Sequence, residues 1–322
     1  MMLTVKSDSV GGLSGLRCLV LGANGFIGTN LCLALAAADV DVWGAGRSEY
    51  ARQELRDQIG WVQLDFTRES SFVHALEGID VVVHLVSTML PAASNIEKTR
   101  DIEENLLTTI RLLEGCREAG VKKVIFASSG GTIYGAQSAM PIGEECLTKP
   151  ISSYGIVKAA IENYLHLYRH LHSLDFVALR IANPFGLFQM PHDQGLVAAL
   201  IGKALKNSTI EIWGDGSIVR DYLCVSDLVD AIINSIILNN HSAPRIYNIG
   251  SGVGRSVNEV LHAIREIHGK NLDVRYHPAR AVDVPVNILN IQQASEFLGW
   301  APRSDWWGSL ELSYRWLNDV YQ

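Results

Sequence analysis

The stretch Gly22-Ala23-Asn24-Gly25-Phe26-Ile27-Gly28 decides the fold. An apolar run from Arg17 to Gly22 precedes it and predicts a β-strand, and the pattern from Gly25 to Ala38 predicts a helix. Glycines at such a turn let backbone N–H groups approach a pyrophosphate, whose charge the helix N-terminus stabilises. The spacing is G-x-x-G-x-x-G rather than G-x-G-x-x-G, so a tight turn without a ligand is the alternative. The position of the turn between a first strand and a first helix favours a dinucleotide site.

Strand-like and helical patterns alternate along the first 180 residues. Further strand-like runs cover Val40–Ala45, Asp80–Val86, Val124–Ser128 and Phe176–Arg180, and helical patterns cover Asn105–Ala119 and Tyr154–His170. This alternation predicts parallel strands that are joined by right-handed helical crossovers. The expected fold class is therefore α/β, a doubly wound parallel sheet of the Rossmann type with a second, smaller mixed α/β substrate domain.

The pattern becomes less regular after Arg180, which predicts a change of domain. We expect a loose N-terminal tail over 1–15, a dinucleotide-binding Rossmann domain over 16–182, and a mainly substrate-binding domain over 183–322. The chain is expected to return to the Rossmann domain within 221–250.

Composition excludes several classes of function. The 322 residues are 48% hydrophobic, enough for a large core, and the net charge of −7 comes without a long basic run. A nucleic-acid or anionic-membrane surface is therefore not expected. No apolar stretch reaches the ~20 residues that span a bilayer. Five cysteines without a C-x-x-C pair predict free thiols in a reducing, cytoplasmic compartment. No metal site is expected, because His166 and His170 share a helix face without a third ligand.

The end of the second strand bears on the choice of nicotinamide cofactor. NAD sites place an acid there to accept from the ribose 2′-hydroxyl. This strand ends Gly44-Ala45-Gly46-Arg47-Ser48, with no acid at the tip. A guanidinium and a hydroxyl suit a 2′-phosphate, so the expected cofactor is NAD(P), with Arg47 favouring NADP; an ordinary exposed arginine is the alternative. Asp65 could accept from the adenine amino group or cap a loop.

A tyrosine and a lysine open the long helix, in Ser152-Ser153-Tyr154-Gly155-Ile156-Val157-Lys158. Tyr154 and Lys158 are four residues apart and share one face. A free tyrosine ionises near pH ~10, and a neighbouring ammonium stabilises the phenolate, which makes Tyr154 a usable general base. An ordinary helix with an exposed lysine is the alternative. The distance of the pair behind the glycine turn favours a catalytic role.

With these motifs the sequence resembles an extended short-chain dehydrogenase/reductase of the nucleotide-sugar epimerase/dehydratase branch, the UDP-glucose 4-epimerase-like type. The resemblance covers nearly the whole chain from Arg17 on. The residues that carry it are Gly22–Gly28, Asp65, His84–Ser87, Asn105, Ser128–Gly135, Tyr154, Lys158, Arg180–Gly186, Trp213–Gly216, Val219–Tyr222, Asn248–Gly250, Arg280–Pro285 and Leu298–Trp300.

The resemblance implies a set of cofactor-binding residues. These are Gly22, Asn24, Gly25, Phe26, Ile27, Gly28, Arg47, Ser48, Asp65, Phe66, Leu85, Val86, Ser87, Asn105, Ser128, Tyr154, Lys158 and Pro184. Asn105 would brace the helix that carries Tyr154. A homodimer through the helix at 105–119 and the helix that begins at Tyr154 is also implied.

The resemblance further implies that the substrate is a nucleotide-diphosphate sugar. Its diphosphate would be held by Asn183, Arg220 and Arg280, and two guanidiniums suit a diphosphate. Salt bridges of the two arginines to Asp221 or Asp283 are the alternative.

One position departs from the family pattern. Family epimerases carry the hydroxyl partner of the catalytic tyrosine where this chain has Gly130. Ser129 or Thr132 must then take that task, or water does; Thr132 is also a candidate substrate contact. Dehydratases of the family place Asp-Glu in this segment and decarboxylases need a glutamate there. This chain has only glycines and a threonine, so both activities are disfavoured.

The leading expectation is 4-epimerisation of a nucleotide-diphosphate hexose or hexosamine through a transient 4-keto sugar. Tyr154 would take the O4 proton while C4 gives hydride to the nicotinamide, and Lys158 would orient the ribose and stabilise the phenolate. An NADPH-dependent reductase of a 4-keto nucleotide sugar is the alternative, favoured by Arg47. A non-catalytic dinucleotide-sensing protein is a third hypothesis, which the intact Tyr154/Lys158 pair disfavours.

Overall fold

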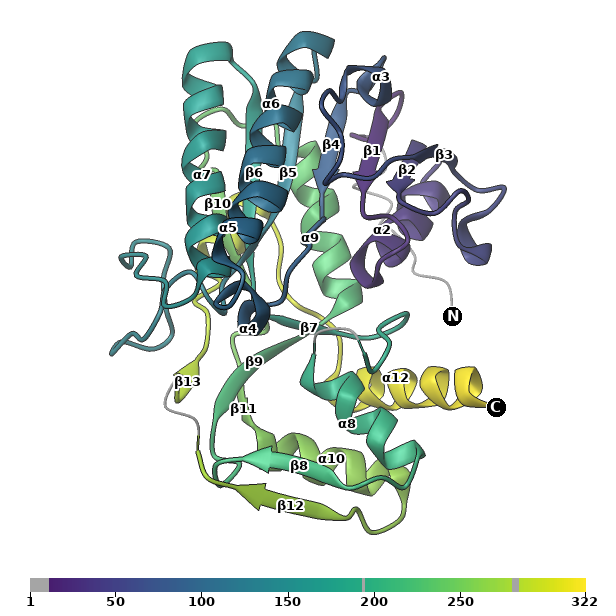
Figure 1. The fold of residues 1–322 in the computed structure, drawn as a ribbon, viewed down its shortest axis with the longest axis vertical. Coiled ribbons are helices and arrows are strands. Elements are labelled where there is room, and N and C mark those ends of the chain that lie inside the picture. The colour runs from purple at the N-terminus through teal and green to yellow at the C-terminus, as the bar shows by residue number, and fades with distance from the viewer. Residues whose placement is uncertain (1–11, 193–194, 280–283) are drawn as a thin grey trace.

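The computed structural model describes residues 12–192, 195–279 and 284–322. Seven parallel strands form the large sheet, in the order β10-β6-β5-β4-β1-β2-β3 (Figure 1). They are β1 (Arg17–Leu21), β2 (Asp41–Gly46), β3 (Gly60–Gln63), β4 (Val81–His84), β5 (Lys123–Ser129), β6 (Asp175–Ile181) and β10 (Ile246–Ile249). The predicted doubly wound parallel sheet is confirmed. The order reverses between β1 and β4, and ligands of such sheets bind at the carboxyl ends of the strands beside this reversal.

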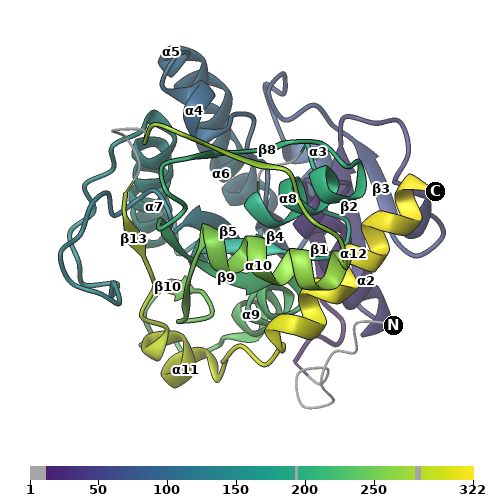
Figure 2. The ribbon, with the colours of Figure 1, turned by 90° about the horizontal axis from the view of Figure 1, so that it is seen from below.

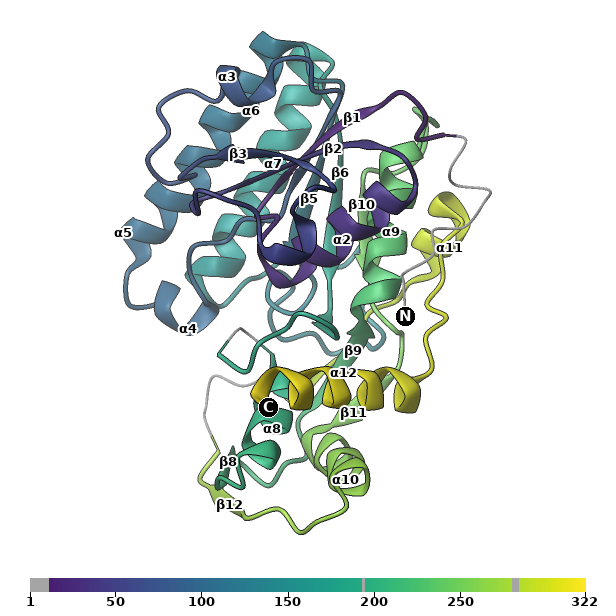
Figure 3. The ribbon, with the colours of Figure 1, turned by 90° about the vertical axis from the view of Figure 1, so that its right-hand side faces the viewer.

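Helices cover both faces of the sheet (Figure 3). The helices on one face are α3 (Val73–Leu76), α6 (Thr108–Ala119) and α7 (Ser153–His172), and those on the other are α2 (Phe26–Ala37), α9 (Val225–Ile237) and α11 (Gln292–Leu298). Two separate cores result because successive strand side chains point to opposite faces. Val82 belongs to the core beneath α6 and α7, and Val83 to the core beneath α2 and α9.

A smaller lobe lies at the carboxyl end of the sheet. It contains α8 (Leu196–Leu205), β8 (Ile210–Trp213), α10 (Val257–His268), β12 (Val274–His277) and α12 (Trp306–Tyr321). Seen from below in Figure 2, α10 and α12 lie across this end of the molecule. Ser256 and Glu259 form a capping box at the start of α10, and Asp305 caps α12. The core of the lobe includes Phe185, Ile201 and Leu310.

The strand β9 (Val219–Cys224) joins the lobe to the large sheet. It pairs with β7 (Asn183–Phe185), β11 (Gly254–Ser256) and β13 (Val286–Asn287). The carboxylate of Asp221, on β9, is fully buried and accepts hydrogen bonds from the backbone N–H groups of Ser251, Gly252 and Leu289. Burial raises the pKa of this carboxyl, and these hydrogen bonds oppose the shift. Asp221 therefore ties three distant segments together at the mouth of the sheet.

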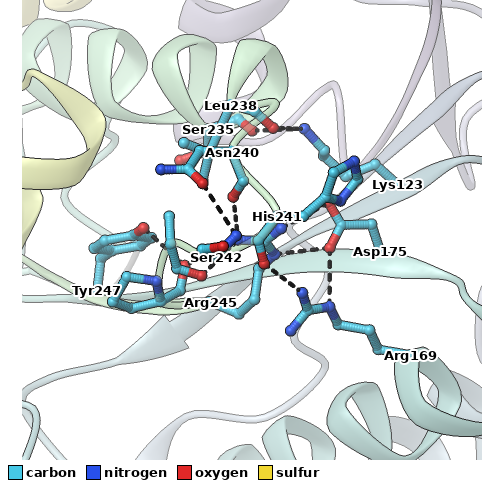
Figure 4. Close-up of polar contacts among 12 residues, drawn as sticks. Lys123, Arg169, Asp175, Ser235, Leu238, Asn240, His241, Ser242, Arg245 and Tyr247 are labelled. Carbon is cyan, nitrogen blue, oxygen red and sulfur yellow. Dashed lines mark hydrogen bonds and ion pairs between the residues drawn. The ribbon is translucent and has the colours of Figure 1, made fainter.

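From β9 the chain runs through α9 to β10, at the edge of the large sheet. Figure 4 shows how this return is fastened. The buried ammonium of Lys123 donates to the carbonyl oxygens of Ser235, Ile236 and Leu238 at the end of α9, at 2.6–3.4 Å. Arg245 donates through Nε to Asp175 at 2.7 Å. These contacts hold α9 and β10 to the starts of β5 and β6, at the opposite end of the sheet from the glycine turn.

Between β4 and α6 the chain forms α4 (Pro91–Ser94), α5 (Lys98–Asp101) and the π-helical turn η2 (Ile102–Leu107). A short 3-10 turn, η1 (Gln53–Leu55), follows β2. The helix predicted from Asn105 to Ala119 thus begins inside a π-helical turn, a feature that is frequent at functional sites. Among the described residues, no helix is long and apolar enough to cross a membrane.

Candidate active site

The glycine turn lies between β1 and α2 and requires glycine at positions 22 and 28. A Cβ on Gly28 would lie 2.2 Å from the carbonyl oxygen of Gly22, and Gly22 itself has a φ of +87°. Gly25 is the N-cap residue of α2, and no side chain caps that helix. Its first backbone N–H groups therefore point to the carboxyl end of the sheet without a side-chain acceptor, which suits an anion.

A cavity of about 690 Å³ lies beside this turn at the ends of β1 to β4. It is lined by ten of the predicted cofactor residues: Gly22, Asn24, Gly25, Arg47, Ser48, Asp65, Phe66, Leu85, Val86 and Ser87. Asp65 also accepts from the backbone and hydroxyl of Thr67, so it caps a turn while lining the cavity. Thr88, Arg100 and Glu104 are among the other residues of the wall. The sequence reasoning did not select these three residues, because they carry no motif.

A second cavity of about 330 Å³ adjoins the first. Gly22, Gly25, Leu85 and Ser87 line both. The other predicted residues on its wall are Phe26, Ile27, Gly28, Ser128, Ser129, Tyr154, Lys158, Asn183 and Pro184. Two adjoining cavities that meet at an uncapped helix N-terminus fit a dinucleotide, with one nucleoside in each cavity and the pyrophosphate between them.

The Tyr154/Lys158 pair lies on the wall of the second cavity. The Lys158 ammonium is 5.4 Å from the centroid of the Tyr154 ring and donates to the carbonyl oxygen of Ala127 at 2.8 Å. Burial lowers the pKa of Lys158 to about 8, while the charges of Asp101 and Glu162 oppose that shift. Burial raises the pKa of Tyr154 to about 12, opposed by a hydrogen bond with Ser87. Tyr154 is therefore a phenol in the free protein, and it needs the nearby ammonium to act as a base.

Asn105 acts on the Tyr154 helix indirectly. Its side-chain NH₂ donates to Asp101 at 2.9 Å, and the other carboxylate oxygen of Asp101 accepts from the hydroxyl of Ser153 at 2.8 Å. In the part of the chain that the structure describes, the side chain of Asn105 otherwise bonds to Thr88. Sequence reasoning missed Asp101 because it stands in a charged run, Arg100 to Glu104, that is typical of a solvent-facing helix.

Close packing around position 130 explains why a glycine stands there. A Cβ there would lie 2.5 Å from the side chain of Leu289 and 2.9 Å from the carbonyl oxygen of Arg180. A hydroxyl side chain therefore does not fit unless Leu289 moves and the backbone carbonyl of Arg180 shifts as well. Ser129 lines the second cavity, and the hydroxyl of Thr132 is buried without a hydrogen-bond partner among the described residues.

The structure describes two of the three residues that were predicted to bind the diphosphate, Asn183 and Arg220. Asn183 lines the second cavity and donates to the backbone carbonyl of Asp221 at 3.0 Å. Arg220 donates to the backbone carbonyls of Val219 and Val284. The Asp221 carboxylate, one alternative partner for Arg220, is occupied by backbone N–H groups. Arg280 and Asp283 lie outside the described residues.

Known proteins share this architecture. A family model described as the NAD dependent epimerase/dehydratase family matches residues 18–250. The chain is 35% identical over 297 residues to the UDP-glucose 4-epimerase of Mycolicibacterium smegmatis, covering 89% of this chain and 94% of that protein. It is 30% identical over 293 residues to a dTDP-4-dehydro-6-deoxyglucose reductase of Escherichia coli, covering 88% and 92%. A crystal structure of UDP-glucose 4-epimerase from Thermus thermophilus in complex with NAD matches with a TM-score of 0.86 and 30% identity, covering 94% and 98%.

The family match spans the glycine turn, both cavities and the Tyr154/Lys158 pair, and the relatives align along almost their whole length. The chain therefore belongs to the NAD dependent epimerase/dehydratase family.

Proposed function

We propose that this chain is an NAD(P)-dependent 4-epimerase of a nucleotide-diphosphate hexose or hexosamine. The observation that carries the proposal is the Tyr154/Lys158 pair on the wall of a cavity that opens directly from the glycine turn. The similarity to UDP-glucose 4-epimerases along nearly the whole chain supports the class of substrate.

In this mechanism Tyr154 takes the proton from the sugar O4. Burial raises the pKa of Tyr154 to about 12, and the positive charge of Lys158, whose own pKa is lowered by burial to about 8, would stabilise the developing phenolate. The nicotinamide, when bound, would accept the hydride from C4 and would later return it to the opposite face of the keto carbon. Rotation of the 4-keto sugar within the site then presents its other face to the nicotinamide, and Tyr154 returns the proton to the oxygen at C4.

The substrate is held at its two ends by different chemistry. Asn183, Arg220 and Arg280 would bind the diphosphate, which anchors the nucleotide and leaves the sugar room to turn. Ser129 or Thr132 would supply the hydroxyl that Gly130 lacks. Ser129 lines the cavity that holds Tyr154, and the hydroxyl of Thr132 is buried without a hydrogen-bond partner among the described residues.

The test is interconversion of UDP-glucose and UDP-galactose, and of UDP-N-acetylglucosamine and UDP-N-acetylgalactosamine, by the purified protein without added cofactor. We expect interconversion, release of a dinucleotide on denaturation, and loss of the reaction in Tyr154→Phe. A protein that binds neither NAD nor NADP, or that binds one of them and leaves all four sugar nucleotides unchanged, contradicts the proposal.

A reductase of a 4-keto nucleotide sugar is the second candidate. Arg47 and Ser48 on the wall of the first cavity favour NADPH, and the E. coli relative is a dTDP-4-dehydro-6-deoxyglucose reductase. A cofactor-free preparation that consumes added NADPH with a 4-keto sugar would place this function first. A dinucleotide sensor without catalysis stays third, because the Tyr154/Lys158 geometry is intact.

We also propose that the chain forms a homodimer through α6 and α7. Apolar side chains make an exposed stripe along one face of α7: Ile156, Tyr164, Leu167 and Leu171. Their spacing follows the helical period, and a self-complementary apolar face suits a two-fold interface.

A cytoplasmic location is a further proposal, supported by the five cysteines being free thiols.

A further inference from the structure

The N-terminus of α7 is capped from outside the helix. The first N–H groups of any helix lack partners within it. Here the N–H of Ser153 donates to the side chain of Asn95 at 2.9 Å, and the N–H of Tyr154 donates to the hydroxyl of Ser94 at 3.0 Å. Only the N–H of Gly155 uses a local cap, the hydroxyl of Ser152 at 3.2 Å. The residue expected to act as the base is thus held through its own backbone by a segment that lies far upstream in the sequence.

A buried carboxylate adds a third tie from the same segment. Asp101 is fully buried and accepts from the hydroxyl of Ser153. Within the described parts of the chain no cation forms a salt bridge with it, although its charge acts on Lys158 from a greater distance; Ser153 and Asn105 are its hydrogen-bond donors. A buried charge is costly unless it is hydrogen-bonded, so this tie to the start of α7 is strongly favoured over an open arrangement.

The other side of this segment forms part of the first cavity. Thr88, Arg100 and Glu104 line that cavity, and Arg100 pairs with Glu104 at 2.6 Å. The backbone N–H of Thr88 donates to Asn105 at 3.0 Å, and Asn105 in turn holds Asp101. Residues 88–105, which we name the clamp segment, therefore touch the cavity on one side and the start of α7 on the other.

We propose that the clamp segment couples dinucleotide binding to the placement of Tyr154, with Ser94, Asn95 and Asp101 as positioning residues that act through the N-terminus of α7. A dinucleotide in the first cavity would restrict the segment through Thr88 and Arg100, and the three ties would carry that order to Tyr154. This inference rests on the proposed function, because it takes from it that the ligand of the first cavity is a nicotinamide dinucleotide. Coupling of this kind is reciprocal, so weakening the ties must also weaken dinucleotide binding.

The charge of Asp101 provides a second readout, the pH dependence of the reaction, which a purely structural role would not change. The ionisable groups that its charge influences are Tyr154 and Lys158 on α7, with Glu162 one turn beyond Lys158. On its own helix Lys98 and Arg100 are exposed, and Glu103 and Glu104 on η2 are exposed or paired with Arg100. The charge of Asp101 raises the pKa of both Tyr154 and Lys158. Asp101→Asn should therefore move the whole pH–rate profile to lower pH.

The experiment compares Ser94→Ala, Asn95→Ala and Asp101→Asn with Ser152→Ala. Ser152→Ala is a matched control. It also removes a side-chain cap from the N-terminus of α7, but Ser152 is the N-cap residue of α7 and does not belong to the clamp segment. Binding of NADH and NADPH is followed by fluorescence titration of the full chain after any co-purified dinucleotide has been removed, together with the melting temperature, kcat and KM. In each clamp variant we expect roughly a 3- to 10-fold loss of dinucleotide affinity, the usual scale for one lost hydrogen bond, and a fall in kcat, with KM for UDP-glucose nearly unchanged. Ser152→Ala should lose similar thermal stability yet bind dinucleotide like the parent.

Two further measurements guard against a merely structural effect. Asn95→Asp keeps an acceptor for the N–H of Ser153 and should restore binding that Asn95→Ala loses. Clamp variants that bind dinucleotide no worse than Ser152→Ala, or a pH–rate profile of Asp101→Asn that coincides with the parent's, would overturn the proposal. The binding readout needs no sugar, so a parent that binds dinucleotide but does not epimerise contradicts only the proposed function; a parent that binds no dinucleotide overturns both.

Discussion

Lys158 holds its ammonium 5.4 Å from the ring centroid of Tyr154 while it donates to the carbonyl oxygen of Ala127 at 2.8 Å. The lysine is thus fixed by the carboxyl end of β5 as well as by its own helix. The same ammonium lies 4.6 Å from the ring centroid of Phe126. A charge held by strand and helix together keeps a constant distance to the phenol, which is what a proton-transfer pair requires.

Tyr154→Phe should lower turnover by at least ~10²-fold, the usual scale for a positioned proton-transfer group. The ring stays in place, so the affinity for the sugar nucleotide should change little. Turnover of UDP-galactose and a binding titration with UDP check the two halves of this prediction. Near-normal turnover in the variant would remove Tyr154 from the mechanism.

Lys158→Met should abolish turnover and yet make the protein more stable at neutral pH. Burial lowers the pKa of Lys158 from 10.5 to about 8, so between those values the unfolded chain binds more protons than the folded one, and the free energy of unfolding rises with pH. Below pH ~8 the full cost of the buried ammonium is present, on the order of 3 kcal/mol before the lost hydrogen bond to Ala127 is subtracted. The net gain of the variant should be roughly 1 kcal/mol.

Urea unfolding of parent and Lys158→Met at about pH 7 and about pH 9.5, on either side of the folded-state pKa, measures this directly. The advantage of the variant should shrink at the higher pH, where the parent's lysine is neutral. An advantage that is equal at both pH values would show that packing, not charge, is responsible.

The sequence was sufficient for those features that follow from local pattern. The alternation of strands and helices predicted the parallel sheet, and the glycine turn and the Tyr154/Lys158 spacing predicted two features that the fold brings to one edge. What it did not reveal depends on contacts between distant segments. Nothing near Gly130 indicates that Leu289 excludes a side chain there, and nothing in the charged run around Asp101 indicates full burial. Both facts arise only when the loops after β5 and β4 meet other parts of the chain.

The hydroxyl that replaces the side chain missing at Gly130 can be found by removing candidates. Thr132→Val and Ser129→Ala are tested singly and together, and the double variant should lose most turnover. Full activity in the double variant would favour water instead.

Gly130→Ser offers the converse test. The added Cβ would lie 2.5 Å from Leu289, so the variant should be less stable than the parent and no more active. Leu289→Ala alone is also destabilising, because Leu289 is fully buried, but it removes one of the two clashes. The double variant should therefore lose less melting temperature than the sum of the two single variants. If Gly130→Ser alone folds as stably as the parent, the steric reason for the glycine is wrong.

The dimer proposal predicts that a charge on the apolar stripe of α7 gives monomers. Leu167 is 43% exposed and Leu171 is 59% exposed, so two large apolar side chains of the stripe face solvent in the single chain. Leu171→Glu should convert a dimer to a monomer in light scattering at micromolar concentration. Val320→Glu, on α12, replaces another exposed apolar residue and should leave the assembly unchanged. A parent that is already monomeric would refute the proposal.

Arg47 should decide between the two nicotinamide cofactors. Three arginines line the first cavity, and two of them are already paired, Arg68 with Asp65 and Arg100 with Glu97 and Glu104. Among the described residues no carboxylate pairs with Arg47, so its guanidinium is available to a 2′-phosphate beside the hydroxyl of Ser48. Charged hydrogen bonds of this kind give roughly a 10- to 10³-fold preference for NADP(H) over NAD(H).

Equilibrium titrations of NADH and NADPH into the parent and into Arg47→Ala measure the preference. We expect the parent to bind NADPH more tightly and Arg47→Ala to bind both alike. Arg68→Ala is the matched control: it removes a guanidinium from the same wall, but one that Asp65 already holds, so the preference should persist. Equal affinities in the parent would defeat the argument, since an arginine that only stacks on the adenine does not distinguish the two dinucleotides. A preference for NADPH together with a cofactor-free preparation would move the reductase ahead of the epimerase, because a one-way reduction consumes its cofactor and must exchange it at every turnover.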